Sequence, residues 1–90
     1  MDSFGKILRA AREKQKMQQK QLAERIGMVP AYVSRLELGF SLPGNELLLT
    51  LCEMFHWDET DMWLLTTVEK MRGSAMQPYV ETLLKERRGE

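Results

Sequence analysis

The chain has 90 residues, of which 43% are hydrophobic and 29% charged, a composition typical of one folded domain and not of a disordered segment. No apolar stretch is long enough to cross a bilayer, no secretory signal opens the chain, and the single cysteine excludes an internal disulfide, so we expect a cytoplasmic protein without a membrane partner. The net charge is zero, but residues 1–40 carry eight Lys/Arg against four Asp/Glu, whereas residues 41–69 carry six acids and no Lys/Arg. A basic first half can meet an anionic partner.

Apolar residues recur with helical spacing, and no long stretch alternates with a period of two, so the sequence predicts an all-α fold. Helices are expected over residues 4–15, 19–26, 30–38 and 46–55, from residue 59 to a break at Gly73, and over 78–88. Gly27 and Gly39 bracket the third helix, because glycine readily takes the left-handed conformation that ends a helix. Pro30 suits its first turn, where a missing N–H costs nothing. Asp2 or Ser3 is expected to cap the first helix, and Asp58 the fifth.

Two short helices joined by a glycine-containing turn predict a helix-turn-helix, whose second helix can enter the DNA major groove. At about 100° per residue, the third helix turns Val29, Val33 and Leu36 toward the core. The opposite side presents Ala31, Ser34, Arg35 and Leu38.

The outward side chains suit contact with DNA. The Arg35 guanidinium can donate two hydrogen bonds to guanine, and Ser34 can reach a phosphate or a base edge. Pro30 and Ala31 offer apolar contact or close approach, and Tyr32 lies at the flank of this face. Gln18 and Gln19 open the second helix, where backbone N–H groups and side-chain amides suit a phosphate oxygen.

These motifs resemble the phage-repressor/Cro (Xre) helix-turn-helix family. The similarity covers residues 4 to 65 and rests on "QxxLAxxIG" at residues 19–27 and "YVSRLExG" at residues 32–39. Further matching positions are Met17, Gln18, Pro43, Leu48, Leu51, Phe55 and Trp63-Leu64-Leu65.

The resemblance implies a compact five-helix DNA-binding domain, to which this chain adds a C-terminal helix. It also implies a transcriptional regulator that works as a homodimer on a short palindromic site, and a structural ion pair between Arg12 and Glu37. We expect residues 1–73 to form the DNA-binding domain and residues 74–90 an extension. The stripe Val80, Leu83 and Leu84 in that extension either covers the same core or pairs with a second copy.

The chain departs from the family pattern at two places. Gln18 and Val29 stand where the family usually has Ser or Thr caps, which predicts weaker helix starts. The loop "FSLPGNE" carries no Lys or Arg, which predicts weaker phosphate binding and a flatter salt dependence. This loop and the end of the preceding helix instead carry the apolar residues Leu38, Phe40 and Leu42. The alternative function is therefore a protein-interaction module that binds a protein partner with this surface.

An enzyme is disfavoured, and no cofactor or metal is expected. His56 is the only histidine and has no nucleophile or metal-ligand partner at a useful spacing. Cys52 lies on the inward side of the fourth helix, where a small buried thiol is expected. The seven methionines mostly follow helical core spacing.

Overall fold

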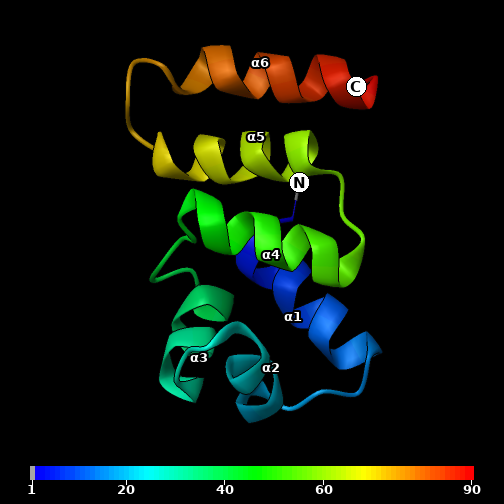
Figure 1. Ribbon diagram of the computed structural model, residues 1–90. Coiled ribbons are helices and arrows are strands. Elements are labelled where there is room, and N and C mark those ends of the chain that lie inside the picture. Colours follow the sequence, from blue (N-terminus) through cyan, green and yellow to red (C-terminus); the bar gives the residue numbers. More distant parts are fainter. Residues whose placement is uncertain (1) are drawn as a thin grey trace. The chain divides into compact units, whose positions relative to one another are not determined.

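A computed structural model describes residues 2–90, which form six α-helices and no strand (Figure 1). The helices are α1 (Phe4–Lys14), α2 (Gln19–Ile26), α3 (Pro30–Leu38), α4 (Asn45–Phe55), α5 (Glu59–Lys70) and α6 (Gln77–Arg88). The predicted all-α fold, with an additional C-terminal helix, is therefore confirmed. The predicted bounds are off by one residue at the end of α1 and at the starts of α4 and α6, and α5 ends at Lys70, before the predicted break at Gly73.

The helices fall into two units, a first that ends at Pro43 and a second that spans Gly44–Glu90. In the first, α3 packs against both α1 and α2. Six apolar side chains of these helices are fully buried: Phe4, Leu8, Leu22, Ala23, Val33 and Leu36. The buried residues of α1 are four apart and those of α3 three apart, and the two of α2 are adjacent on one side of that helix. The amphipathic spacing of the sequence therefore explains which faces are buried.

The contact between α1 and α3 depends on a glycine that the sequence pattern did not single out. A Cβ at Gly5 would lie 2.4 Å from the carbonyl oxygen of Glu37 and 2.6 Å from that of Leu36. Glycine within a helix is destabilising relative to alanine. Here it lets the backbone of α1 approach the last turn of α3 directly.

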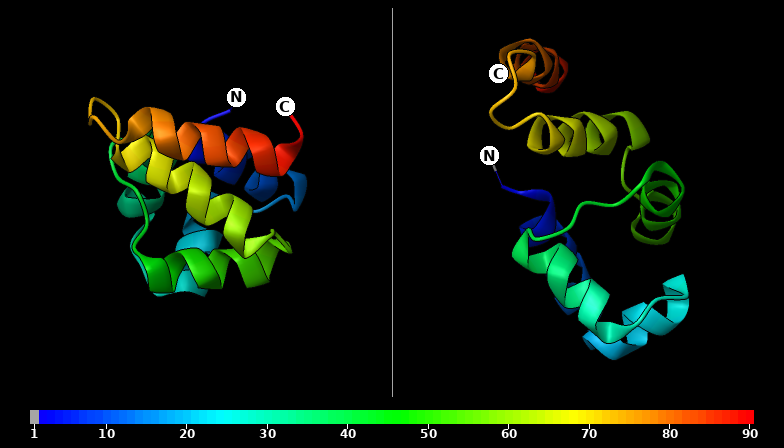
Figure 2. Two further views of the ribbon diagram at one scale, coloured as in Figure 1. Left: turned by 90° about the horizontal axis from the view of Figure 1, so that it is seen from above. Right: turned by 90° about the vertical axis from the view of Figure 1, so that its left-hand side faces the viewer.

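In the second unit, α5 packs against both α4 and α6, and both views of Figure 2 show α5 and α6 side by side. The buried apolar side chains here are Leu48, Leu51, Cys52, Phe55, Met62, Leu64, Leu65, Val68 and Leu84. Leu84 is fully buried, whereas Leu83 is 55% exposed. Of the predicted C-terminal stripe, Leu84 is thus buried and Leu83 faces solvent.

Three charged side chains fasten α6 to the start of α5. Asp58 caps α5, since its Oδ1 accepts the backbone N–H of Asp61 at 2.9 Å. The same oxygen accepts Arg87 Nη2 at 2.9 Å, and Arg87 Nε pairs with Asp61. These bonds lower the pKa of Asp58, chiefly through the Asp61 N–H and next through Arg87. The sequence placed Asp58 as a cap but did not identify Arg87 as its partner.

Candidate nucleic-acid interface

The turn between α2 and α3 has the geometry that its glycine predicts. Gly27 ends α2 with φ of 70°, and the N–H of Met28 donates to the carbonyl of Ala23 at 2.8 Å. Pro30 occupies the first turn of α3, and Gly39 ends that helix with φ of 84°. The two helices are therefore joined by Gly27, Met28 and Val29 alone.

Val29 corrects one prediction, because its side chain is 63% exposed and does not face the core. It is the N-cap of α3, with an extended backbone at φ −94° and ψ 153°. The count of 100° per residue applies only within the helix, so it misplaced the residue before the first turn.

The outer face of α3 is largely open to solvent. Pro30, Ala31 and Arg35 are exposed, and Ser34 and Tyr32 are half-buried. Val33 and Leu36, on the opposite side, are fully buried. Apart from Val29, the predicted division of α3 into an inner and an outer side matches the observed burial.

The side chain of Arg35 contacts the loop that follows α3. Its Nε donates to Ser41 Oγ at 3.2 Å. Neither Nη group donates to any residue in the described part of the chain. The bond to Ser41 restricts the guanidinium and leaves its two outer nitrogens available for a ligand. Because Ser41 follows the helix, the helical pattern gave no sign of this bond.

Gln18 and Gln19 differ in their surroundings. Gln18 is exposed, and its backbone N–H donates to the Gln21 side chain at 2.8 Å. Gln18 and Gln21 thus form a capping box at the start of α2, a feature not anticipated from the sequence. Gln19 is half-buried, and its Nε2 donates to Glu37 Oε1 at 3.1 Å.

Arg12 and Glu37 join three segments of the first unit. Arg12 Nε and Nη2 donate to the two Glu37 carboxylate oxygens at 2.6 and 3.0 Å, and Nη1 donates to the carbonyl of Met17 at 2.8 Å. The side chains are only 12% and 3% exposed. The hydrogen bonds that Arg12 donates to Glu37 raise the pKa of Arg12, against the opposing effect of burial. With Gln19 as the fourth member, the network fixes α2 and α3 relative to the end of α1.

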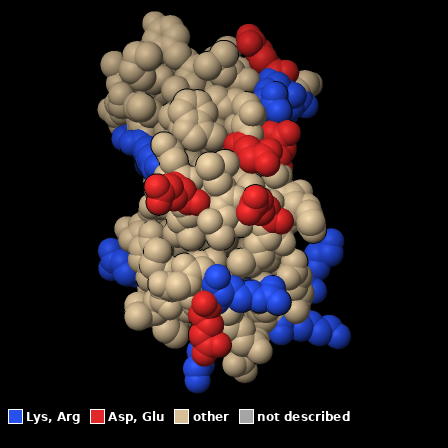
Figure 3. Space-filling view, viewed as in Figure 1, with Lys and Arg blue, Asp and Glu red and all other residues tan. Residues whose placement is uncertain are grey.

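The positively charged side chains of the first unit lie on or between α1, α2 and α3, and the loop after α3 has none. Residues 1–43 carry eight Lys/Arg against four Asp/Glu, and Figure 3 shows blue side chains spread over the region of α1, α2 and α3. The loop itself is apolar, with Leu38 and Phe40 exposed by 64% and 70% and Leu42 half-buried.

No group of three or more His, Cys, Asp and Glu side chains lies close enough to hold a metal ion within residues 2–90. Cys52 is buried, and burial raises the pKa of its thiol. Every helix in this range is too short or too polar to serve as a membrane span.

Comparison with known proteins agrees with this geometry. A family model described as helix-turn-helix matches residues 8–56, which is more than half of the chain. The protein therefore belongs to the Xre/Cro-like helix-turn-helix family, a family of DNA-binding transcription regulators that are generally not enzymes. Neither curated proteins nor solved structures gave a match.

Proposed function

We propose that this protein regulates transcription by binding a specific double-stranded DNA sequence, with α3 in the major groove. The supporting observation is the open outer face of α3, where Pro30, Ala31 and Arg35 are exposed beside Ser34. A helix presented in this way fits the wide groove of B-form DNA.

Arg35 is the proposed base reader. Its unengaged Nη groups suit the O6 and N7 acceptors of guanine, and Ser41 restricts the side chain before binding. Ser34 would bond a neighbouring base edge or phosphate. The proposed part of Pro30 and Ala31 is apolar contact with a thymine methyl.

Phosphate contacts are proposed for Gln18, Tyr32 and the start of α2. Because the amide of Gln19 is engaged with Glu37, its proposed contact is made through the backbone N–H at the helix N-terminus. The exposed Lys16 and Lys20 flank this end of α2 and would supply positive charge.

We further propose that the protein acts as a homodimer, with residues 1–73 as the DNA-binding domain and residues 74–90 as the dimerising extension. Exposed Met76, Tyr79 and Leu83, spaced three and four residues apart, provide an apolar stripe along the extension. Two recognition helices would then lie about 34 Å apart, one turn of DNA. Sedimentation of the full chain and of Leu83→Glu tests this; a monomeric full chain would contradict it.

The second candidate is a protein-interaction module that uses the surface of Leu38, Phe40 and Leu42. The exposure of Leu38 and Phe40 favours it, since two neighbouring large apolar side chains in solvent often mark a binding surface. This surface adjoins Arg35, so a bound protein partner would compete with DNA.

Selection of bound sequences from random duplex DNA with the purified protein separates the two candidates. The proposal expects enrichment of a short two-fold symmetric sequence that contains guanine at the position read by Arg35. No enrichment at moderate salt would favour the protein-interaction module.

A further inference from the structure

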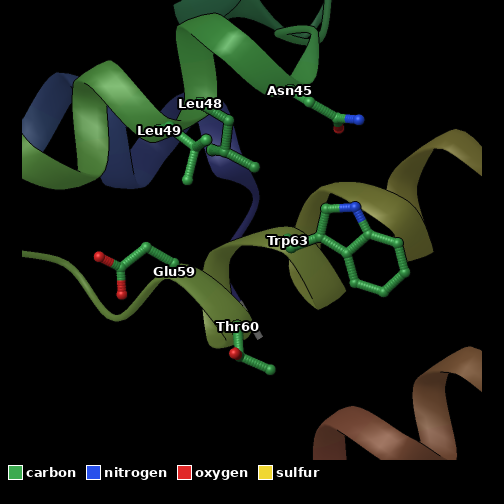
Figure 4. A pocket seen from close by; sticks show the side chains of 6 residues that line it. All are labelled: Asn45, Leu48, Leu49, Glu59, Thr60 and Trp63. Carbon is green, nitrogen blue, oxygen red and sulfur yellow. The ribbon is translucent and has the colours of Figure 1, made fainter.

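A pocket of about 330 Å³ opens between α4 and α5, within the second unit. It is lined by Asn45, Leu48 and Leu49 from α4 and by Glu59, Thr60 and Trp63 from α5. Figure 4 shows the two leucines and the Trp63 indole on opposite sides of the opening. We call this feature the α4–α5 pocket.

The apolar rim of the α4–α5 pocket is open to solvent. Leu49 is 55% exposed and Trp63 is 48% exposed, whereas Leu48 at the base is 3% exposed. Large apolar side chains around a small depression are typical of a site that receives a single protruding side chain from a partner.

Acidic side chains surround this rim. Glu59 lines the pocket, and Glu46 and Glu53 lie three residues before and four after Leu49, on the same side of α4. None of the three forms an ion pair within residues 2–90. Residues 41–69 contain no Lys or Arg at all, and Figure 3 shows red side chains over the region of α4 and α5. The three carboxylates at the pocket are therefore uncompensated by ion pairs, whereas Arg87 pairs with the neighbouring Asp58 and Asp61.

We propose that the α4–α5 pocket binds a basic amphipathic segment of a second protein, which inserts one large apolar side chain between Leu49 and Trp63. Lys and Arg beside that anchor would face Glu46, Glu53 and Glu59. In such an arrangement the buried apolar anchor supplies most of the affinity, and the charged side chains around it select the partner.

A second copy of this chain fits the pocket less well. Its exposed apolar stripe on α6 consists of Met76, Tyr79 and Leu83. By the helical count, Lys85 and Arg88 lie on the other side of that helix, and the nearby Arg87 is engaged with Asp58 and Asp61. Among the described residues of α6, no cation that is free of an ion pair lies on the side of this apolar stripe.

A library of random peptides displayed on phage and selected on the full-length protein tests the chemistry of the partner. We expect enriched sequences in which Lys or Arg flanks a Leu, Phe or Trp at helical spacing. Absence of enrichment, or enrichment of neutral or acidic sequences, would overturn the proposal.

Matched variants then test the place of binding with an enriched synthetic peptide. Leu49→Ala should weaken its binding about tenfold, the effect of losing one anchor contact. Leu38→Ala, another exposed leucine, should leave it unchanged. Equal weakening by both, or by neither, would contradict the assignment to the α4–α5 pocket.

Charge reversal tests the acidic rim. Glu53→Lys should weaken binding several-fold and remove much of its salt dependence, whereas Glu86→Lys, the same change on α6, should not. Glu53 is in the last turn of α4, where a lysine is compatible with the helix. Equal binding to both variants would overturn the electrostatic part of the proposal. Leu49→Ala should keep full affinity for the selected DNA. Peptide binding and DNA binding are therefore measured independently, and either proposal can be wrong while the other holds.

Discussion

The guanidinium of Arg12 and the carboxylate of Glu37 form a two-point ion pair between α1 and α3, with N–O distances of 2.6 and 3.0 Å. The same guanidinium also donates to the carbonyl of Met17, and the same carboxylate also accepts from the side-chain amide of Gln19. Four hydrogen bonds in this nearly buried cluster thus connect α1, the following loop, α2 and α3. The orientation of α3 is therefore fixed by a polar network beside the apolar core.

Replacing Glu37 with glutamine should destabilise the fold by about 3 kcal/mol, because Arg12 is then left as a nearly buried charge without its counter-ion. Urea unfolding measures the change. The matched control is Glu13→Gln, which breaks the exposed ion pair with Arg9 and should cost less than about 1 kcal/mol. Equal costs would mean that the Arg12–Glu37 pair is no more important than a surface pair.

Gly5→Ala should destabilise the protein by about 1–3 kcal/mol, although alanine is the better helix former. The added Cβ would meet the Glu37 and Leu36 carbonyl oxygens at distances that require α1 and α3 to separate. Gly44→Ala is the control, since its Cβ would meet nothing within 4 Å. Thermal unfolding of both variants measures the difference; a stable Gly5→Ala would show that the two helices are not so closely packed.

Asp58→Asn should lower stability at neutral pH, and its difference from the unmodified protein should shrink as the pH falls below about 4. The pKa of Asp58 is lower in the folded than in the unfolded protein. Its carboxylate therefore stabilises the fold at pH values above its unfolded pKa. This stabilisation is lost as the pH falls through the pKa of the folded protein. Asparagine retains capping ability, so the variant isolates the charge that faces Arg87. Unfolding at pH 7 and at pH 3 gives the comparison, and a pH-independent difference would argue against the Asp58–Arg87 contact.

Phe40→Lys should strengthen DNA binding and steepen the slope of log affinity against log salt by about 0.9, the value for one further phosphate contact. Phe40 is exposed in the loop after α3, where the chain has no cation. Ala75→Lys adds the same charge to an exposed position in the second unit. If both substitutions changed the slope equally, the loop would have no particular place at the phosphate backbone.

Much of the fold follows from local sequence rules. Helical spacing predicted the buried faces, and Gly27, Pro30 and Gly39 fixed the bounds of α3, because cap and first-turn preferences act within a few residues. Val29 was misplaced for the same reason, since a cap residue no longer follows the helical rotation.

Contacts between distant residues could not be predicted from the spacing within helices. Gly5 approaches α3, Arg87 reaches the start of α5, and Gln19 joins the Arg12–Glu37 pair only because tertiary packing brings these helices together. The Arg12–Glu37 pair itself was expected from the family resemblance alone. The same holds for the α4–α5 pocket, whose two walls are set by how α4 packs on α5.

Binding of Arg35→Ala to the duplex selected by the unmodified protein tests the central claim most directly. We expect a loss of about 1–3 kcal/mol in affinity, relaxed preference at one guanine and unchanged folding. Arg72→Ala, which removes an exposed arginine outside the helix-turn-helix, is the control and should bind as the unmodified protein does. Equal affinity and equal sequence preference in Arg35→Ala would contradict the assignment of α3 as the DNA-reading helix.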